Sequence, residues 1–310
     1  MNSDIFGLHH ITAISNSAKN NHHFYTHVLG LRFVKKTVNF DDPGTYHFYF
    51  GDEHGTPGTI ITFFPWEGIS KGDNGAGMAT HTAYSVPAGS FDFWKERLAN
   101  NGISAFETEI MEEKVLSFND PDGMQLQLVI PNKVDERKPW VTEEIAGEFG
   151  IKGFHSVTLT LNSADATSKV LIDILGYRLA EKAGSRYRFV TDTIGTANIV
   201  DVLEDPNMPE GRNAAGTNHH IAFRVRDDEV LMDVRKRVVD AGLHITPKID
   251  RDYFFSLYFR EPGGVLFEIA TDNPGFTVDE PLESLGSELK LPKQHEGMRK
   301  NLEAVLPSLD

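Results

Sequence analysis

Four short blocks of this 310-residue sequence occur twice, and the two sets keep nearly the same spacing along the chain. Two pairs are GLHHIT at 7–12 with GFHSVT at 153–158, and LGLR at 29–32 with LGYR at 175–178. The other two are HTAYSV at 81–86 with HIAFRV at 220–225, and DPDG at 120–123 with EPGG at 261–264. Such self-similarity indicates a duplicated structural unit. We therefore predict a tandem duplication.

Each half is predicted to repeat a looser pattern of one strand, one helix and two or three further strands. Apolar and β-branched runs bounded by Gly, Pro or Asn indicate the strands, and a Gly often follows the last turn of a helix. In the first unit we expect a strand, a helix and three strands at 7–14, 17–29, 32–38, 46–50 and 59–64. In the second we expect the same order at 79–86, 90–101, 105–109, 114–118 and 124–130. The third unit runs from 153 to about 203 and the fourth from 217 to 270, with a helix near 228–241.

This pattern predicts an α+β fold built from a tandem duplication of paired βαβββ modules, four in all. The predicted domains are residues 5–131 and 151–271, joined by a linker at 132–150. A C-terminal extension, 272–310, is expected to end in a short helix near 295–305. It either packs across the mouth of the barrel through Phe276 and Leu282 or forms a plain surface extension.

The composition excludes several classes of function. A formal net charge of −15 disfavours nucleic acid and anionic membrane surfaces as partners, since both are polyanions. The sequence contains no cysteine, which excludes disulfides, zinc–thiolate sites and cysteine nucleophiles. No segment resembles a signal peptide or reaches membrane-spanning length, so we expect a cytoplasmic protein.

The duplication also sorts the candidate metal ligands. Two predicted strands carry a double histidine, and a third carries Glu268 within an apolar run. A buried carboxylate needs a cationic or metal partner, and two imidazoles with one carboxylate make up a known type of metal site. We therefore predict that His10, His220 and Glu268 bind a divalent metal ion. Their counterparts in the duplicate are, in the same order, Ser156, His81 and Gln127, a weaker set that indicates a decayed copy.

Neighbouring residues are placed by the alternation of side chains along a strand. Thr12 should share a face with His10, whereas His9 and His219 should point to the opposite faces of their strands. Each of these histidines, taken alone, could equally be a hydrogen-bonded core residue. Four other histidines have no patterned partners and are expected on the surface or in loops: His47, His54, His244 and His295.

The four-unit pattern resembles the vicinal oxygen chelate superfamily, which has the glyoxalase or extradiol dioxygenase fold, over about residues 5–271. The resemblance implies curled mixed sheets that close around a metal. Longer runs are similar to the hydroquinone ring-cleaving dioxygenases of the quinone-responsive Gram-positive and dichlorohydroquinone types. These runs are LHHITA at 8–13, FVKKTVNFDDPGTY at 33–46, GTPGTIITFF at 55–64, DRDYFFSLYFR at 250–260 and PGF at 274–276.

The resemblance implies an Fe(II)-dependent enzyme that inserts O2 into a hydroquinone- or catechol-type ring, in detoxification of quinones or other aromatics. It implies iron ligands at His10, His220 and Glu268, although Mn, Zn or Ni could occupy the site in purified protein. It also implies that five residues line or support the pocket: His9, Thr12, His219, Arg251 and Tyr258.

Two alternatives remain open at this point. The chain could be another metal-dependent enzyme of this superfamily, of the glyoxalase or thiol transferase type. It could instead be a non-catalytic protein that sequesters an aromatic compound or a drug. Fold alone does not separate these functions. The expected partners are a small aromatic substrate and O2, and a homo-oligomer is compatible with the sequence.

Overall fold

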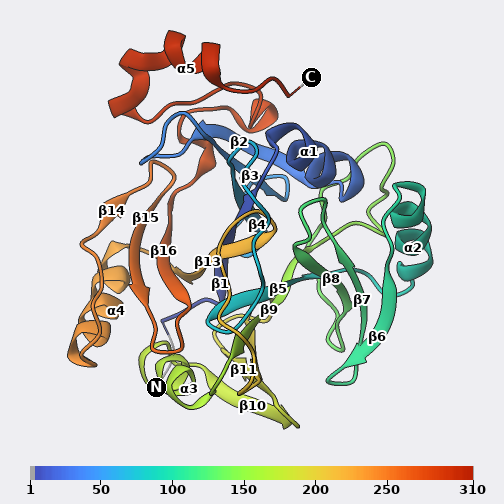
Figure 1. Cartoon of the computed structure of the whole chain (residues 1–310), viewed down its shortest axis with the longest axis vertical. Helices are drawn as coiled ribbons and strands as arrows, with labels where there is room; N and C mark the ends of the chain where they lie inside the picture. Colours follow the sequence, from blue (N-terminus) through green and yellow to red (C-terminus); the bar gives the residue numbers. More distant parts are fainter. Residues whose placement is uncertain (1–3, 310) are drawn as a thin grey trace.

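The computed structural model describes residues 4–309, which form two eight-stranded mixed sheets (Figure 1). Each sheet takes strands from both halves of the sequence. In spatial order, the first sheet consists of β14 (Ile249–Asp250), β15 (Phe254–Arg260), β16 (Leu266–Pro274), β13 (Thr217–Val225), β1 (Leu8–Ser15), β4 (Ile60–Pro65), β3 (Tyr46–Gly51) and β2 (Arg32–Val38). The second consists of β10 (Arg178–Ala183), β11 (Arg186–Val190), β12 (Ile199–Glu204), β9 (Gly153–Leu161), β5 (Met78–Ser85), β8 (Gln125–Ile130), β7 (Glu113–Asn119) and β6 (Phe106–Ile110).

Helices connect the first two strands of each unit. In the first and third units the helix begins as an α-helix and ends in a π-helical turn, labelled η. The connecting helices are α1 with η1 (Ala18–His23, Phe24–Val28), α2 (Phe91–Asn100), α3 with η2 (Asp165–Lys169, Val170–Ile174) and α4 (Asp228–Asp240). Side chains at helical spacing are buried, as in α4, where Val230, Val234 and Val238 pack inward.

The pairing of the units explains how distant parts of the chain meet. Strand β1 of the first unit lies antiparallel to β13 of the fourth, and each has a parallel neighbour from its own unit, β4 and β16. The second sheet repeats this arrangement with β9 and β5 at its centre, flanked by β12 and β8. The predicted fold class, duplicated βαβββ modules in curled mixed sheets, is therefore confirmed. The predicted linker at 132–150 and the two domains that it would separate stay predictions. Each sheet contains strands from both sides of this segment.

One central strand of each sheet, β1 in the first and β9 in the second, is buried along its whole length. Apolar side chains dominate these strands, and their burial is the main favourable term in folding. The two sheets contact each other through β5 and β13, where the Asn218 side-chain amide donates to the Ala79 carbonyl oxygen at 3.0 Å. This contact attaches the strand that carries His220 to the second sheet.

The C-terminal extension packs against the first sheet and lies at the top of Figure 1. Phe276 stacks on Tyr253, with ring centroids 5.1 Å apart. The buried Lys35 ammonium donates to Asp279 at 2.6 Å and to Glu280. Of the two predicted arrangements, the structure therefore shows a packed extension. Its helical segments are three 3-10 helices, η3 (Phe276–Val278), η4 (Leu282–Ser284) and η5 (Lys293–Met298), and the α-helix α5 (Arg299–Val305).

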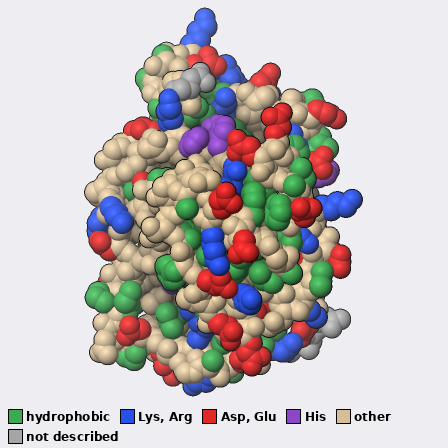
Figure 2. Space-filling model, turned by 90° about the vertical axis from the view of Figure 1, so that its right-hand side faces the viewer, with side chains coloured by type: hydrophobic (Ala, Val, Ile, Leu, Met, Phe, Trp, Pro, Cys, Tyr) green, Lys and Arg blue, Asp and Glu red, His purple; other side chains and the backbone are tan. Residues whose placement is uncertain are grey.

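Acidic and basic side chains are interspersed on the face of the molecule shown in Figure 2. Within residues 4–309, no helix has the length and apolar character needed to cross a membrane.

Candidate metal centre

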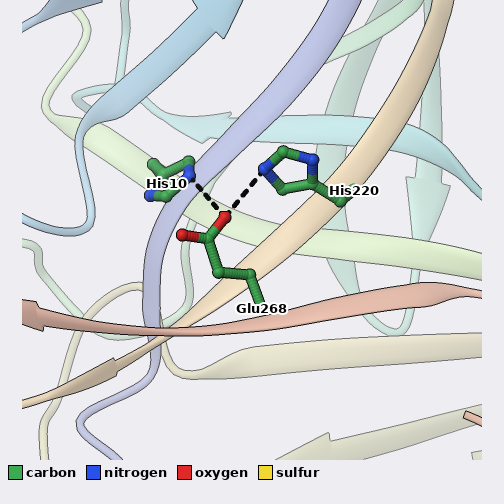
Figure 3. Close-up of side chains that lie close together, drawn as sticks. All are labelled: His10, His220 and Glu268. Carbon is green, nitrogen blue, oxygen red and sulfur yellow. Dashed lines mark ion pairs between the residues drawn. The ribbon is translucent and has the colours of Figure 1, made fainter. Parts of the chain in front are cut away.

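Three buried side chains from neighbouring central strands converge at one point in the first sheet (Figure 3). His10 projects from β1, His220 from β13 and Glu268 from β16. The Glu268 Oε2 atom lies 3.1 Å from His10 Nε2 and 2.8 Å from His220 Nε2. The structure therefore brings the three predicted ligands together, and their three ligand atoms lie within 4.8 Å of one another.

The Glu268 carboxylate is fully buried and its two oxygens have different surroundings. Oε1 accepts a hydrogen bond from the Ser256 hydroxyl, whereas Oε2 accepts none from any described residue. Burial alone would raise the pKa of Glu268, but the adjacent His10 and His220 outweigh burial and hold this pKa well below its usual range. An ionised oxygen without a hydrogen bond, facing two imidazoles, fits a divalent cation.

Hydrogen bonding fixes the tautomer of His10. The Nε2 atom of His9 lies 3.0 Å from the carbonyl oxygen of Thr271, which can only accept, so this nitrogen carries the hydrogen. Burial lowers the pKa of His9 well below its usual value, so the ring is neutral and its Nδ1 is an acceptor. The Nδ1 atom of His10 lies 2.9 Å from that acceptor and must therefore carry a hydrogen. With this tautomer, the neutral form of His10 has its lone pair on Nε2, the atom nearest Glu268, as metal ligation requires.

The pair His219 and His220 repeats this contact, with 2.8 Å between the two Nδ1 atoms. Burial lowers the pKa of His220 and lowers that of His219 to about 3, so both rings are neutral. One hydrogen is shared across this contact. When it lies on His220, the Nε2 atom of His220 has a free lone pair toward Glu268 as well.

Both histidine pairs sit at β-bulges. The register of β1 against β13 skips His9 between Leu8 and His10, and it skips His219 between Asn218 and His220. A bulge adds one residue to a strand and redirects its side chain. This is why His219 lines the same cavity as His220, so the expectation that His219 faces the opposite side was wrong. His9 does not line the cavity and instead contacts His10 and the backbone of Thr271.

A cavity of about 360 Å³ is lined by His10 and His220, and aromatic rings form much of its wall. Its volume suits a ligand with one aromatic ring. Three of the remaining predicted residues line it: Thr12, Arg251 and Tyr258. The Arg251 guanidinium lies 5.3 Å from the ring centroids of both Tyr258 and Phe40. A larger hollow of about 610 Å³ lies beside α1, but its buried carboxyl, Asp120, is engaged by Tyr25 and the Met124 amide.

Other cavity residues were not predicted from the sequence. His47 was expected on the surface or in a loop, but it lies in β3, is 9% exposed and lines the cavity with Tyr49, so that expectation was wrong. Ser256, which holds Glu268, was also missed. The signal for His47 and Tyr49 was their alternation in an otherwise apolar strand, which places both side chains on one face.

In the second sheet, charged side chains occupy the place that corresponds to the three candidate ligands. The counterparts His81, Ser156 and Gln127 lie there, and burial lowers the pKa of His81 to about 4. The Arg188 guanidinium donates to Glu113 at 2.7 Å and to both Asp201 oxygens at 2.9 and 3.0 Å. The guanidinium groups of Arg188 and Arg186 thus pair with the carboxylates at this place.

Comparisons with known proteins agree with the fold. The family model described as "Glyoxalase/Bleomycin resistance protein/Dioxygenase superfamily" matches residues 7–128 and 153–269. MhqO of Bacillus subtilis (strain 168), named as a candidate ring-cleaving dioxygenase, is 45% identical over 302 residues, covering 97% of this chain and 95% of MhqO. The chlorohydroquinone/hydroquinone 1,2-dioxygenase of Sphingobium indicum is 35% identical over 303 residues, covering 96% and 94% of the two chains.

A crystal structure of a candidate dioxygenase from Bacillus subtilis superimposes with a TM-score of 0.96 at 42% identity, and it covers 100% of this chain and 99% of the other. The family match spans most of the chain, and the relatives align over nearly their full length. The chain belongs to the glyoxalase/bleomycin resistance protein/dioxygenase superfamily.

Proposed function

We propose that this protein is an Fe(II)-dependent ring-cleaving dioxygenase that acts on a hydroquinone-type aromatic ring. The convergence of His10, His220 and Glu268, two of which line a cavity of one-ring size, is the observation that carries the proposal. Two imidazoles and one carboxylate leave open coordination positions on iron, which oxygen chemistry needs. The relatives named as ring-cleaving and hydroquinone dioxygenases support the same reaction class.

Bound at these ligands, Fe(II) would supply a Lewis acid for a phenolate oxygen and a redox centre for dioxygen. The ring itself provides the electrons. One ring carbon–carbon bond breaks beside a hydroxyl-bearing carbon, and both oxygen atoms enter the product as a carboxyl and an aldehyde. No external reductant is therefore required.

The surrounding residues have to place the ring, because the hydroxyls of a hydroquinone lie opposite each other and only one can reach the metal. Phe254, which contacts the rings of both His9 and His10, would pack against the substrate face. Tyr258, whose ring lies edge-on to His220 at 5.6 Å, would donate to a substrate oxygen. Arg251 would attract a negatively charged oxygen. His219 lines the same space.

His9 acts differently from these residues. It does not reach the cavity, so we propose that it positions His10 by accepting the hydrogen of His10 Nδ1. A role in quinone or aromatic detoxification and a cytoplasmic location stay predictions, as does the preference for iron over Mn, Zn or Ni.

Oxygen uptake by anaerobically purified, Fe(II)-loaded protein tests the proposal. Uptake should follow addition of hydroquinone or methylhydroquinone, and labelled dioxygen should deliver both atoms to the product. Catechol is the comparison substrate, and the hemithioacetal of methylglyoxal and glutathione tests the glyoxalase alternative. No uptake with any hydroquinone or catechol at full iron occupancy would exclude the proposed reaction.

A further inference from the structure

Four buried side chains form an unbroken series of hydrogen bonds that ends in the cavity. The Tyr49 hydroxyl lies 3.0 Å from His47 Nδ1, and His47 Nε2 lies 3.0 Å from the Thr62 hydroxyl. The Thr62 hydroxyl lies 2.9 Å from the Thr12 hydroxyl. We call these four residues, contributed by β3, β4 and β1, the relay.

The hydrogen bonding of Tyr49, which lies at the other end from Thr12, sets the direction of the relay. The Tyr49 side chain is fully buried, and His47 is its one hydrogen-bond partner among the described side chains. A phenol hydrogen without an acceptor is unfavourable in the interior, so Tyr49 donates and His47 Nδ1 accepts. The neutral His47 ring then carries its hydrogen on Nε2 and donates to Thr62. Thr62 in turn donates to Thr12.

This direction leaves the Thr12 hydroxyl hydrogen for the cavity. Thr12 accepts from Thr62, and residues 4–309 provide no second hydrogen-bond partner for its hydroxyl. It lies two positions after His10 on β1, so both side chains share one face, and both line the cavity. The hydrogen is therefore directed into the space where a ligand would meet the metal.

We propose that Tyr49 and His47 are positioning residues that hold the Thr12 hydroxyl as a hydrogen-bond donor to a negatively charged oxygen of a bound phenolate substrate. This inference rests on the proposed function. A fixed donor favours an anionic oxygen over a neutral hydroxyl, and it costs no reorganisation during the reaction. Thr12 would contact substrate, whereas Tyr49 and His47 act through it.

The second sheet shows that the fold itself does not require this neutral relay. In the paired registers, Thr62 faces Tyr49 and Thr12, and Asp201 likewise faces Arg188 and Thr158. Arg186, two residues before Arg188, donates to Thr158 at 3.2 Å and to Asp201 at 3.4 Å. The same backbone positions thus hold ion pairs in the second sheet. Neutral, directional groups occur in the sheet that contains the three candidate ligands.

Two substitutions measure the relay at its ends. Tyr49→Phe removes one hydroxyl and retains the buried ring, and Thr12→Val removes the donor itself. Loss of one hydrogen bond predicts a fall in kcat/KM of about twofold to tenfold for Tyr49→Phe. Loss of a donor to developing charge predicts a fall of about tenfold or more for Thr12→Val. Tyr46→Phe is the matched control, because Tyr46 lies on the same strand but donates to Pro307, outside the cavity.

A double-mutant cycle separates a positioning role from a structural one. If Tyr49 acts through Thr12, Tyr49→Phe should lower kcat/KM in the wild-type background but change it less than about twofold in the Thr12→Val background. Equal factors in both backgrounds would overturn the inference. The same four proteins, loaded with Fe(II) under nitrogen, are also titrated with para-nitrophenol. This second cycle compares the affinities of the four proteins for para-nitrophenol, so it tests the relay even if the wild-type protein consumes no oxygen. A lack of oxygen consumption would count against the proposed function alone.

Nitrogen NMR of histidine-labelled, metal-free protein provides a readout that does not depend on activity. The signals of His47 are assigned by their loss in His47→Gln. The inference predicts a neutral ring with hydrogen on Nε2 in the wild type and in Tyr46→Phe, and a mixture of tautomers in Tyr49→Phe. Hydrogen on Nδ1 in the wild-type protein would contradict the proposed direction of the relay.

Discussion

At the scale of single residues, the central feature is that each candidate histidine ligand is preceded by a histidine at a β-bulge. The bulges at His9 and His219 bring the Nδ1 atoms of neighbouring rings to 2.9 and 2.8 Å. Adjacent residues of a regular strand point to opposite faces and could not make this contact. The bulge thus lets the residue next to a ligand set the ligand's tautomer.

His9→Phe tests this role directly. The variant loses the acceptor for His10 Nδ1, so the His10 hydrogen can move to Nε2 and block ligation. Losing a partner that orients a ligand typically costs about 10-fold to 100-fold in metal affinity. Competition for Fe(II) against a chelator, under nitrogen, measures the change. His54→Phe, in an exposed turn, is the control, and an equal affinity for the two variants would remove His9 from the site.

The three candidate ligands could be predicted from the sequence because the duplication aligns each of them with a residue of the other copy. Two of those three counterparts are weaker metal ligands, so only one copy offers a complete set. Ser256, His47 and Tyr49 could not be predicted in this way. Their contacts join strands that are distant in sequence, such as the 2.9 Å contact between Thr62 and Thr12. Strand periodicity indicates the face of a residue but not its neighbour on the next strand.

At the scale of structural elements, the two sheets share backbone geometry but differ in how they balance charge. The second sheet repeats both bulges, at Thr80 and His155. His155 Nδ1 lies 3.0 Å from the Ser156 hydroxyl, as His9 contacts His10 in the first sheet. The weak metal-donor set of the second sheet lies beside the guanidinium of Arg188, which forms ion pairs with both Glu113 and Asp201.

Arg188→Met should therefore destabilise the protein. It removes the cation that bonds both Glu113 and Asp201, which keep only His155 and the more distant Arg186 as partners, and breaking such a buried pair typically costs about 3–5 kcal/mol. Urea unfolding measures the loss. Arg178→Met, which removes the exposed ion pair between Arg178 on the neighbouring strand β10 and Asp192, should cost much less, because water screens this pair. Similar losses for both variants would show that the Arg188 network does not support the second sheet.

The same network predicts a dependence of stability on pH. Burial raises the pKa of Glu113, but its bonds with His155 and Arg188 outweigh burial and lower the pKa from 4.5 to about 2. A carboxyl with a lowered pKa in the folded state contributes its stability above the unfolded value, and this contribution is lost as the pH falls toward 2. Urea unfolding measures the free energy of unfolding of the wild type and of Glu113→Gln. The difference between the two values should become smaller as the pH falls from about 4.5 to about 2. A constant difference across that range would contradict the lowered pKa.

At the scale of the whole molecule, the candidate site exists only where the first and fourth units meet. His10 and Glu268 lie at opposite ends of the sequence, yet β1 and β16 are both neighbours of β13. The internal repeat predicted the four units and their elements, because local hydrophobic pattern and Gly punctuation fix each one. The local pattern alone does not show which units pair, but the predicted ligand set does, because a site made of His10, His220 and Glu268 requires the first and fourth units to meet.

The most direct test of this account is a stoichiometric Fe(II) titration of the anaerobic protein, with the bound iron measured by elemental analysis. The account predicts one iron per chain for the wild type and for His81→Ala, which alters the second sheet. It predicts a sharp loss of bound iron for Glu268→Gln. Unchanged iron in Glu268→Gln, or lost iron in a folded His81→Ala protein, would contradict the assignment of the site to His10, His220 and Glu268.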